Sequence, residues 1–156
     1  MAKMFQFPLQ KVLSLREMIE ESRAITLENS RRALKQEQEK LQNLESRKES
    51  LLEEEKSNDM ERMTLSLNDL RVSMQYISQL NDMISNQMQQ VERSNELVQR
   101  ERDNLLEASK DRKIVEKLRE RHLANYIKSY RKKEMKKESE IALRVAVKNN
   151  TSGDDS

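Results

Sequence analysis

The stretch LNDLRVSMQYISQLNDMISNQMQQVERSNELVQRERDNL, residues 67–105, carries the repeat that decides the fold. Its repeat positions follow one another at alternating steps of three and four residues, the spacing of residues that face a partner helix in a coiled coil. They are Leu67, Leu70, Met74, Ile77, Asn81, Ile84, Met88, Val91, Asn95, Val98, Arg102 and Leu105. The sequence therefore predicts that this stretch is one helix of a coiled coil.

The composition is that of long helices with a thin core. Of the 156 residues, 35% are hydrophobic, 37% are charged and 3% are aromatic, whereas roughly 45–50% of a globular domain is apolar. The chain contains one glycine and one proline, the two residues that most disfavour a helix interior. We therefore expect an all-α protein without a thick multilayer core.

A second, weaker seam precedes the first one along the chain. Its positions follow the same steps and are Leu27, Ser30, Leu34, Glu37, Leu41, Leu44, Lys48 and Leu51. The two seams are out of phase, and the break between them coincides with the turn-favouring sequence Lys-Ser-Asn-Asp at residues 56–59. A turn at this break would fold the two helices against each other.

The predicted fold is all-α: a long antiparallel two-helix coiled-coil hairpin with an overhanging C-terminal helix. Residues 1–147 form this single hairpin, with a first helix over about 8–57, a turn over about 57–61 and a second helix over about 62–147. Residues 148–156 are polar, and we expect them to form a disordered tail. A continuous dimeric rod of about 140 residues, roughly 210 Å long, is the alternative.

A hairpin that closes near Asp59 sets the two seams in a definite register. Its layers pair Leu51 with Leu67, Leu44 with Met74, Leu41 with Ile77, Glu37 with Asn81, Leu34 with Ile84, and Leu27 with Val91. The register is weakest where Arg16 meets Arg102, because two like charges then face each other.

The N-terminal residues hold two of the few aromatic side chains, Phe5 and Phe7. Pro8 follows them and suits the first turn of a helix, so a helix is expected to begin at about Pro8. The two phenylalanines then belong to an extended lead. They either fold back onto a neighbouring helix or offer a handle to a partner, and both interpretations are open.

The second helix outlasts the first and becomes strongly basic. In the predicted register Pro8 lies opposite Lys110, so the helix beyond Lys110 has no intramolecular partner. Between Lys110 and Lys137 the chain has twelve Lys or Arg and four Asp or Glu, a net charge of +8 that leaves −6 for the remainder. This field predicts an acidic partner. Nucleic acid is the generic candidate, although the interspersed acids weaken it, and a merely solvated face is the alternative.

A second stripe lies beside the main seam. Tyr76, Leu80, Met83 and Gln87 recur at steps of four, three and four residues, displaced from the predicted seam toward the outside of the helix. Leu44 and Arg47 lie near them across the hairpin. Because a two-helix hairpin buries only its seam, we expect an exposed patch that serves either self-association or docking of a second protein.

Catalysis and cofactor binding have little support. The single histidine, His122, lies among basic residues with no nucleophile arranged around it, and the single glycine, Gly153, excludes a glycine-rich phosphate loop. The chain has no cysteine, and its carboxylates read as solvated helix faces. No apolar run approaches the roughly 18 residues needed to cross a membrane. We expect a cytoplasmic protein that is not an enzyme and has no metal, cofactor or small-molecule substrate.

Two short motifs carry a family resemblance. The opening FQFPLQKVLSLRE, residues 5–17, and LLEASKDRK at 105–113, continued by EKL at 116–118, resemble the two ends of the flagellar export protein FliJ family. Size and helical content agree over nearly the whole chain. The resemblance implies a hairpin similar to the central stalk of rotary ATPases, at work in the flagellar type III export apparatus and hence in motility.

The resemblance also implies partners. They are the hexameric export ATPase, the cytoplasmic domain of the membrane-embedded export gate, and export chaperones, with the protein associated peripherally with the cytoplasmic face of the inner membrane. Carried onto this sequence, the ATPase ring would contact Lys110, Arg112, Lys113, Lys117, Leu118, Arg119 and Arg121. The gate would contact Tyr76, Leu80, Met83 and Gln87, with Leu44 and Arg47. A stalk protein of a related virulence secretion system and a basic nucleic-acid-binding coiled coil remain alternatives.

Overall fold

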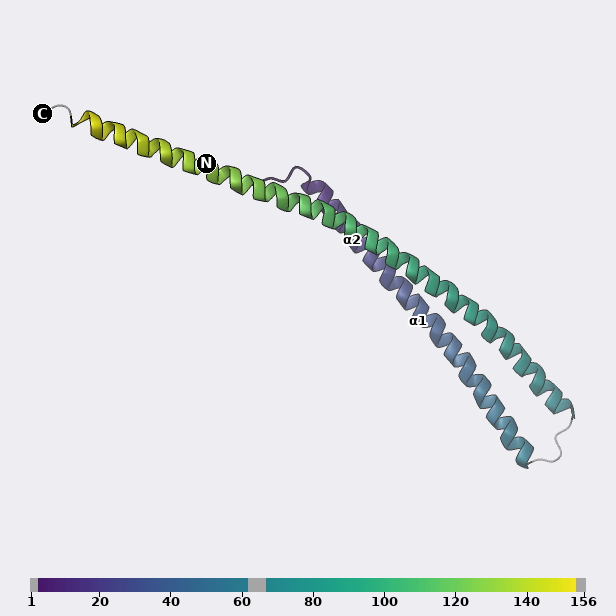
Figure 1. The fold of residues 1–156 in the computed structure, drawn as a ribbon. Coiled ribbons are helices and arrows are strands. Elements are labelled where there is room, and N and C mark those ends of the chain that lie inside the picture. Colours follow the sequence, from purple (N-terminus) through teal and green to yellow (C-terminus); the bar gives the residue numbers. More distant parts are fainter. Residues whose placement is uncertain (1–2, 62–66, 154–156) are drawn as a thin grey trace. The chain divides into compact units, whose positions relative to one another are not determined.

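Two long helices make up almost all of the chain. The computed structural model describes residues 3–61 and 67–153, with side chains for 3–57 and 67–153. Helix α1 spans Gln10–Glu61 and helix α2 spans Leu67–Thr151. They run antiparallel to each other (Figure 1), and no strand occurs within the described ranges. The all-α hairpin that the sequence predicts is confirmed.

The chain divides into two compact units, and both helices contribute to each. One unit combines Met1–Met18 with Ser109–Ser156, and the other is Ile19–Ala108. The first therefore contains the N-terminal lead, the start of α1 and the C-terminal half of α2. The second contains the rest of α1 and the N-terminal half of α2.

In the Ile19–Ala108 unit, α1 turns the predicted face toward α2. All eight predicted positions from Leu27 to Leu51 are buried or half-buried, while the residues between them are exposed. Leu27 and Ser30 are buried most completely. The Ser30 hydroxyl donates a hydrogen bond to the Thr26 carbonyl at 3.0 Å, so its burial leaves no unsatisfied donor.

Helix α2 buries five of the twelve positions of its predicted seam. The line Ile77, Ile84, Val91, Val98 and Leu105 faces inward, but Leu67, Leu70, Met74, Asn81, Met88, Asn95 and Arg102 are exposed. The second inward line is instead Ser73, Leu80, Gln87, Ser94, Glu101 and Ala108. Most members of this line are small or polar, so the two helices approach each other over short side chains with Leu80 as the main apolar anchor.

The register also differs from the prediction. The Gln87 amide of α2 hydrogen-bonds Glu37 of α1, so the partner of Glu37 is not Asn81, and the predicted pairing is wrong by nearly one heptad. The cause is the position of the chain reversal. Helix α1 runs through residues 57–61, where the turn was predicted, and α2 begins at Leu67. The connecting residues 62–66 lie outside the described part of the chain.

The other unit begins with the extended lead. The Gln10 amide bonds the Phe7 carbonyl at 3.1 Å and the Leu13 amide bonds the Leu9 carbonyl at 2.9 Å, which starts α1 just after Pro8, close to the predicted position. Phe7 and Leu13 are buried. In place of Arg102, Arg16 meets Asp111 of α2, with 3.5 Å between the guanidinium nitrogen and the carboxylate oxygen. The like-charge clash of the predicted register is therefore absent.

Helix α2 continues past Val147, where the sequence indicated its end, to Thr151. The Lys148 carbonyl accepts a hydrogen bond from the Ser152 amide at 3.2 Å, and hydroxyl side chains add further hydrogen bonds to the last carbonyls. Thr151 Oγ1 donates to the carbonyls of Val147 and Lys148, and Ser152 Oγ donates to that of Lys148 at 3.1 Å. Of the predicted tail, residues 154–156 lie outside the described part of the chain.

Candidate docking surfaces on the two units

The stripe of Tyr76, Leu80, Met83 and Gln87 was predicted to face outward, but part of it is buried between the helices. Leu80 is only 2% exposed and is the most deeply buried large side chain among the described residues, so its predicted outward position is wrong. Gln87 is half-buried on Glu37, and Leu44 is half-buried in the α1 seam. Tyr76 is half-buried, while Met83 is 52% exposed.

What remains at the surface is a small patch built around one cation–aromatic contact. The guanidinium carbon of Arg47 on α1 lies over the Tyr76 ring of α2, 5.6 Å from its centroid. This contact holds the Arg47 side chain against the ring. Met83 lies two turns further along the same side of α2. We call Arg47, Tyr76 and Met83 the tyrosine patch.

A polar layer lies beside the tyrosine patch. Gln87 Nε2 donates to the Glu37 carbonyl oxygen at 2.9 Å and to a Glu37 carboxylate oxygen at 2.6 Å. Lys40 Nζ lies 3.2 Å from the other carboxylate oxygen. The hydrogen bond from Gln87, helped by Lys40, lowers the pKa of the Glu37 carboxyl below its ordinary value of 4.5. The layer therefore keeps a carboxylate charged inside the seam.

The basic segment of α2, residues 110–137, belongs to the unit that combines Met1–Met18 with Ser109–Ser156. Some of its predicted contact residues are exposed and others are half-buried. Five of the predicted ATPase-contacting residues are exposed, namely Lys110, Lys113, Lys117, Arg119 and Arg121. Arg112 and Leu118 are half-buried. Arg112 Nη1 bonds Glu116 Oε2 at 2.7 Å one turn further on, so this arginine is committed to an ion pair within α2. We call the five exposed residues the basic face.

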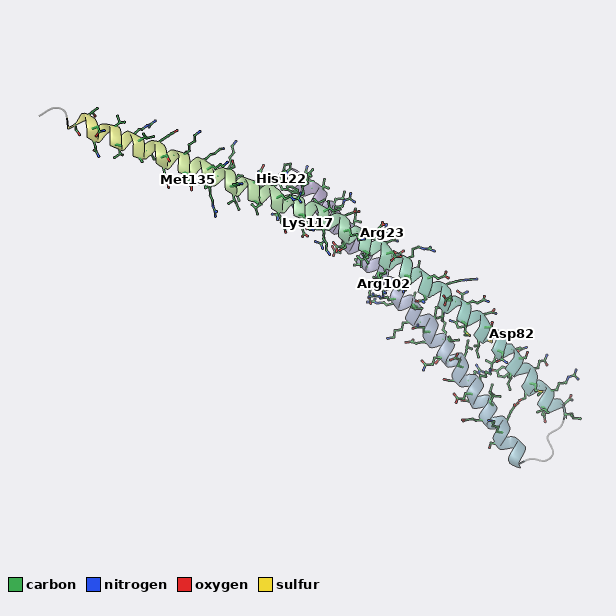
Figure 2. The ribbon with its side chains drawn as sticks, viewed as in Figure 1. Arg23, Asp82, Arg102, Lys117, His122 and Met135 are labelled. Carbon is green, nitrogen blue, oxygen red and sulfur yellow. The ribbon has the colours of Figure 1, made fainter. Side chains whose placement is uncertain are left out.

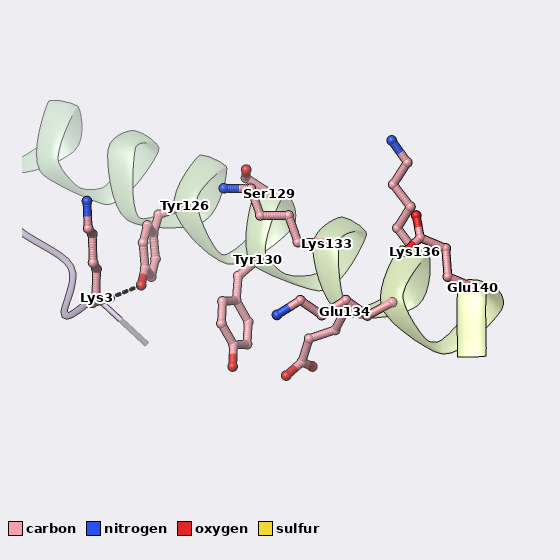
Figure 3. Close-up of a pocket in the computed structure, with 9 residues that line it drawn as sticks. Lys3, Tyr126, Ser129, Tyr130, Lys133, Glu134, Lys136 and Glu140 are labelled. Atoms are coloured by element: carbon pink, nitrogen blue, oxygen red, sulfur yellow. Dashed lines mark hydrogen bonds between the residues drawn. The ribbon is translucent and has the colours of Figure 1, made fainter. Parts of the chain in front are cut away.

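The N-terminal lead folds back onto α2, which decides between the two interpretations of Phe5 and Phe7. The Phe7 and His122 rings meet edge to face with centroids 5.5 Å apart, and the Phe5 and Tyr126 rings are tilted at the same separation. The Tyr126 hydroxyl donates a hydrogen bond to the Lys3 carbonyl (Figure 3). The lead therefore covers α2 for about one turn beyond His122.

The aromatic contacts continue along α2. Tyr126 stacks on Tyr130 with ring centroids 6.5 Å apart, and both rings line a shallow open pocket with Lys3, Lys133 and Lys137 (Figure 3). A hydrogen bond and the negative charge of Glu134 raise the pKa of the Tyr130 hydroxyl. Four lysines and two glutamates line the pocket together with the two tyrosine rings.

The true overhang starts after Tyr126, not at Lys110. Every residue from Ile127 to Gly153 is exposed, and Figure 2 shows the side chains near Met135 standing out from α2 with no other segment of the unit beside them, in contrast to those near His122. The predicted start is wrong because the register is shifted and the lead adds cover. Sequence reasoning also missed an exposed apolar cluster near the C-terminus: Ile141, Leu143, Val145 and Val147.

Other kinds of site find no support in the described ranges. Neither helix there is long and apolar enough to span a bilayer. No group of His, Cys, Asp and Glu within those ranges could hold a metal ion.

Comparison with known proteins agrees with the hairpin. Among solved structures, the chain resembles one described as a YscO homologue, CT670, from Chlamydia trachomatis. The two are 18% identical, the match covers 95% of this chain and 99% of that chain, and the TM-score is 0.56. At this identity the likeness concerns the fold alone. No curated protein matches the chain significantly. The family description "Flagellar FliJ protein" matches residues 5–151, and the chain therefore belongs to the FliJ family.

Proposed function

We propose that this protein is a stalk of the flagellar type III export apparatus that links the export ATPase ring to the export gate. It catalyses no reaction and acts by binding both partners. The observation that carries the proposal is the family match over residues 5–151, because it spans the lead, both helices and both candidate surfaces. The flagellar family favours this role over that of a stalk in a virulence secretion system.

The basic face is the proposed contact for the ATPase ring. Its five exposed cations lie on a stretch of α2 that contacts α1 through the exposed ion pair of Arg16 and Asp111. A positively charged helix suits an acidic surface, because charge complementarity raises the association rate and fixes orientation. Arg112 and Leu118 support this face from the hairpin side rather than contact the ring.

The tyrosine patch is the proposed contact for the gate. Tyrosine and arginine are the residues most enriched at energetically important interface positions, and the Arg47–Tyr76 contact holds both before a partner arrives. Leu80, which the sequence placed in this contact, acts from beneath by anchoring α2 on α1. Gln87 and Leu44 likewise act within the seam.

Charge reversal tests the ATPase contact. The variant Lys110→Glu/Lys113→Glu/Lys117→Glu should weaken binding to the purified export ATPase at least about tenfold, with an unchanged helical circular-dichroism signal. The control variant, Arg31→Glu/Lys35→Glu/Arg93→Glu, alters three exposed cations of the other unit and should bind normally. Equal ATPase binding by both variants would remove the basic face from the proposal.

Truncation of the tyrosine patch tests the gate contact. Tyr76→Ala/Met83→Ala should reduce binding to the cytoplasmic gate domain by about tenfold or more. Met74→Ala/Met88→Ala removes two exposed methionines outside the patch and serves as the matched control. A gate affinity that falls equally in both variants would argue against a specific patch.

The remaining parts of the role follow from the same assembly. We place the protein at the cytoplasmic face of the inner membrane and include export chaperones among its partners. A strain that lacks this chain should lose flagellar export and swimming, and expression of the chain should restore both. Restoration by a variant that binds neither ATPase nor gate would contradict the stalk role.

A further inference from the structure

The last three turns of α2 carry apolar side chains that nothing in the unit covers. Ile141 is 62% exposed and Leu143 is 65% exposed, and Val145 and Val147 are similarly open to solvent. Ala142 and Ala146 lie between them and are exposed as well. A contiguous apolar patch on an isolated helix is unfavourable in water, so it marks a binding surface.

The helix pitch sorts this segment into four sides. Residues four apart in sequence share a side of an α-helix. Ile141 shares one with Val145, Ala142 one with Ala146, and Leu143 one with Val147, so three sides are apolar. The fourth side is basic and holds Lys137, Arg144 and Lys148.

This distribution distinguishes between kinds of partner. A groove on a folded protein covers only one side of a helix. A helix that docks in such a groove therefore has its apolar residues at positions i, i+3 and i+4, which share that side. Within residues 141–148 apolar residues occupy most of the circumference and leave a narrow basic strip. A helix lying in the boundary of a lipid layer meets acyl chains over a wide arc and keeps its strip of cations at the headgroups.

The charges favour an anionic surface. Within residues 136–148 the cations are Lys136, Lys137, Arg144 and Lys148, and the acids are Glu138 and Glu140. The acids precede the apolar cluster, whereas Arg144 and Lys148 lie within and just after it. Long basic side chains can extend from a buried apolar stretch to anionic headgroups.

We propose that residues 137–148 of α2 bind the surface of a membrane rich in anionic lipid. In this state Ile141, Val145, Leu143 and Val147 enter the boundary between headgroups and acyl chains, while Lys137, Arg144 and Lys148 face the headgroups. The inference concerns this segment alone and does not depend on the export role, so loss of either leaves the other standing.

A single tryptophan tests the insertion directly. The chain has no tryptophan, so the full-length variant Val145→Trp reports on this segment only. Vesicles of phosphatidylcholine with about half phosphatidylglycerol should shift its emission to the blue, and brominated acyl chains should quench it. Val72→Trp, an exposed position of the other unit, should show neither effect. Unshifted emission from Val145→Trp would overturn the proposal.

Sedimentation with the same vesicles tests the contributions of the basic and of the apolar side chains to membrane binding. Lys137→Glu/Arg144→Glu and Ile141→Ser/Val145→Ser should each lower partitioning at least about tenfold, because each removes one of the two attractions. Vesicles of phosphatidylcholine alone should bind the unaltered chain about tenfold more weakly as well. Equal binding to both vesicle types, or a dimer of the unaltered chain that Ile141→Ser/Val145→Ser dissociates, would contradict a lipid partner.

Discussion

Gln87 of α2 holds Glu37 of α1 by two hydrogen bonds from a single amide nitrogen, one to the backbone carbonyl and one to the carboxylate. The pair sits between apolar layers of the seam, where Leu34 and Leu41 flank Glu37 one turn away on either side. A charged acceptor satisfied in this way strengthens the contact, because hydrogen bonds to ions exceed those between neutral groups.

This pair predicts a pH-dependent stability. The lowered pKa of Glu37 means that its contribution is complete above the ordinary carboxyl value of 4.5 and is lost as the pH falls through the lower value of the folded state. Unfolding by urea at several pH values should therefore show that Gln87→Ala loses less stability than the unaltered chain as the pH falls below 4.5. Parallel stability profiles for the two proteins would contradict the assigned role of Gln87.

Leu80 predicts a large and local effect on stability. Leu80→Ala removes the most deeply buried large side chain and should reduce the free energy of unfolding by about 2–4 kcal/mol. Met74→Ala changes a side chain that is 64% exposed and should cost less than about 0.5 kcal/mol. Urea titration of both variants tests the buried face, because the seam read from the sequence predicts the opposite order.

Cysteine pairs test the register, since the chain has no cysteine of its own. The Glu37–Gln87 contact places Leu34 opposite Val91, one turn away. Leu34→Cys/Val91→Cys should therefore form an intramolecular disulfide under mild oxidation, whereas Leu34→Cys/Ile84→Cys should not. Efficient closure of the second pair and failure of the first would restore the register expected from sequence.

Because the N-terminal lead packs on α2, we expect it to protect the α2 backbone amides near His122 from hydrogen exchange. Phe7 is 7% exposed and packs on His122, so Phe7→Ala should lower the opening free energy of the neighbouring backbone by about 2 kcal/mol. Hydrogen exchange of the amides around His122 and Tyr126 measures this loss. Amides around Met135, which has no cover, should exchange at the same rate in both proteins and provide the internal control.

Sequence alone could predict the hairpin and the face of α1. The spacing of Leu27 to Leu51 fixed which side of α1 is buried, because a seven-residue repeat leaves little choice of face. The choice on α2 failed for a physical reason. Met74 and Met88 are more hydrophobic than Ser73 and Ser94, but shorter side chains let two helices pack closely, and Leu80 supplies the anchor.

The candidate surfaces were predictable only in part. The basic face follows from charge, because five of the seven residues predicted to contact the ATPase ring are exposed cations. The turn signal at residues 56–59 misled the register, because those residues are compatible with the end of a long helix when its neighbours favour one. The overhang was therefore predicted to start at Lys110, although it starts after Tyr126. The charge pattern gave no sign of the exposed apolar residues that follow Glu140.

The polar layer at Glu37 has a consequence for how the hairpin finds a unique alignment. A seven-residue repeat is nearly indifferent to sliding by one heptad, because leucines and isoleucines then meet other leucines and isoleucines. A slide of one heptad would bring Leu80 or Ser94 opposite Glu37 in place of Gln87, and neither side chain has an amide that could donate to both the Glu37 carbonyl and its carboxylate. The apolar residues thus hold the helices together without fixing their alignment, and the amide of Gln87 selects the pairing that the chain adopts.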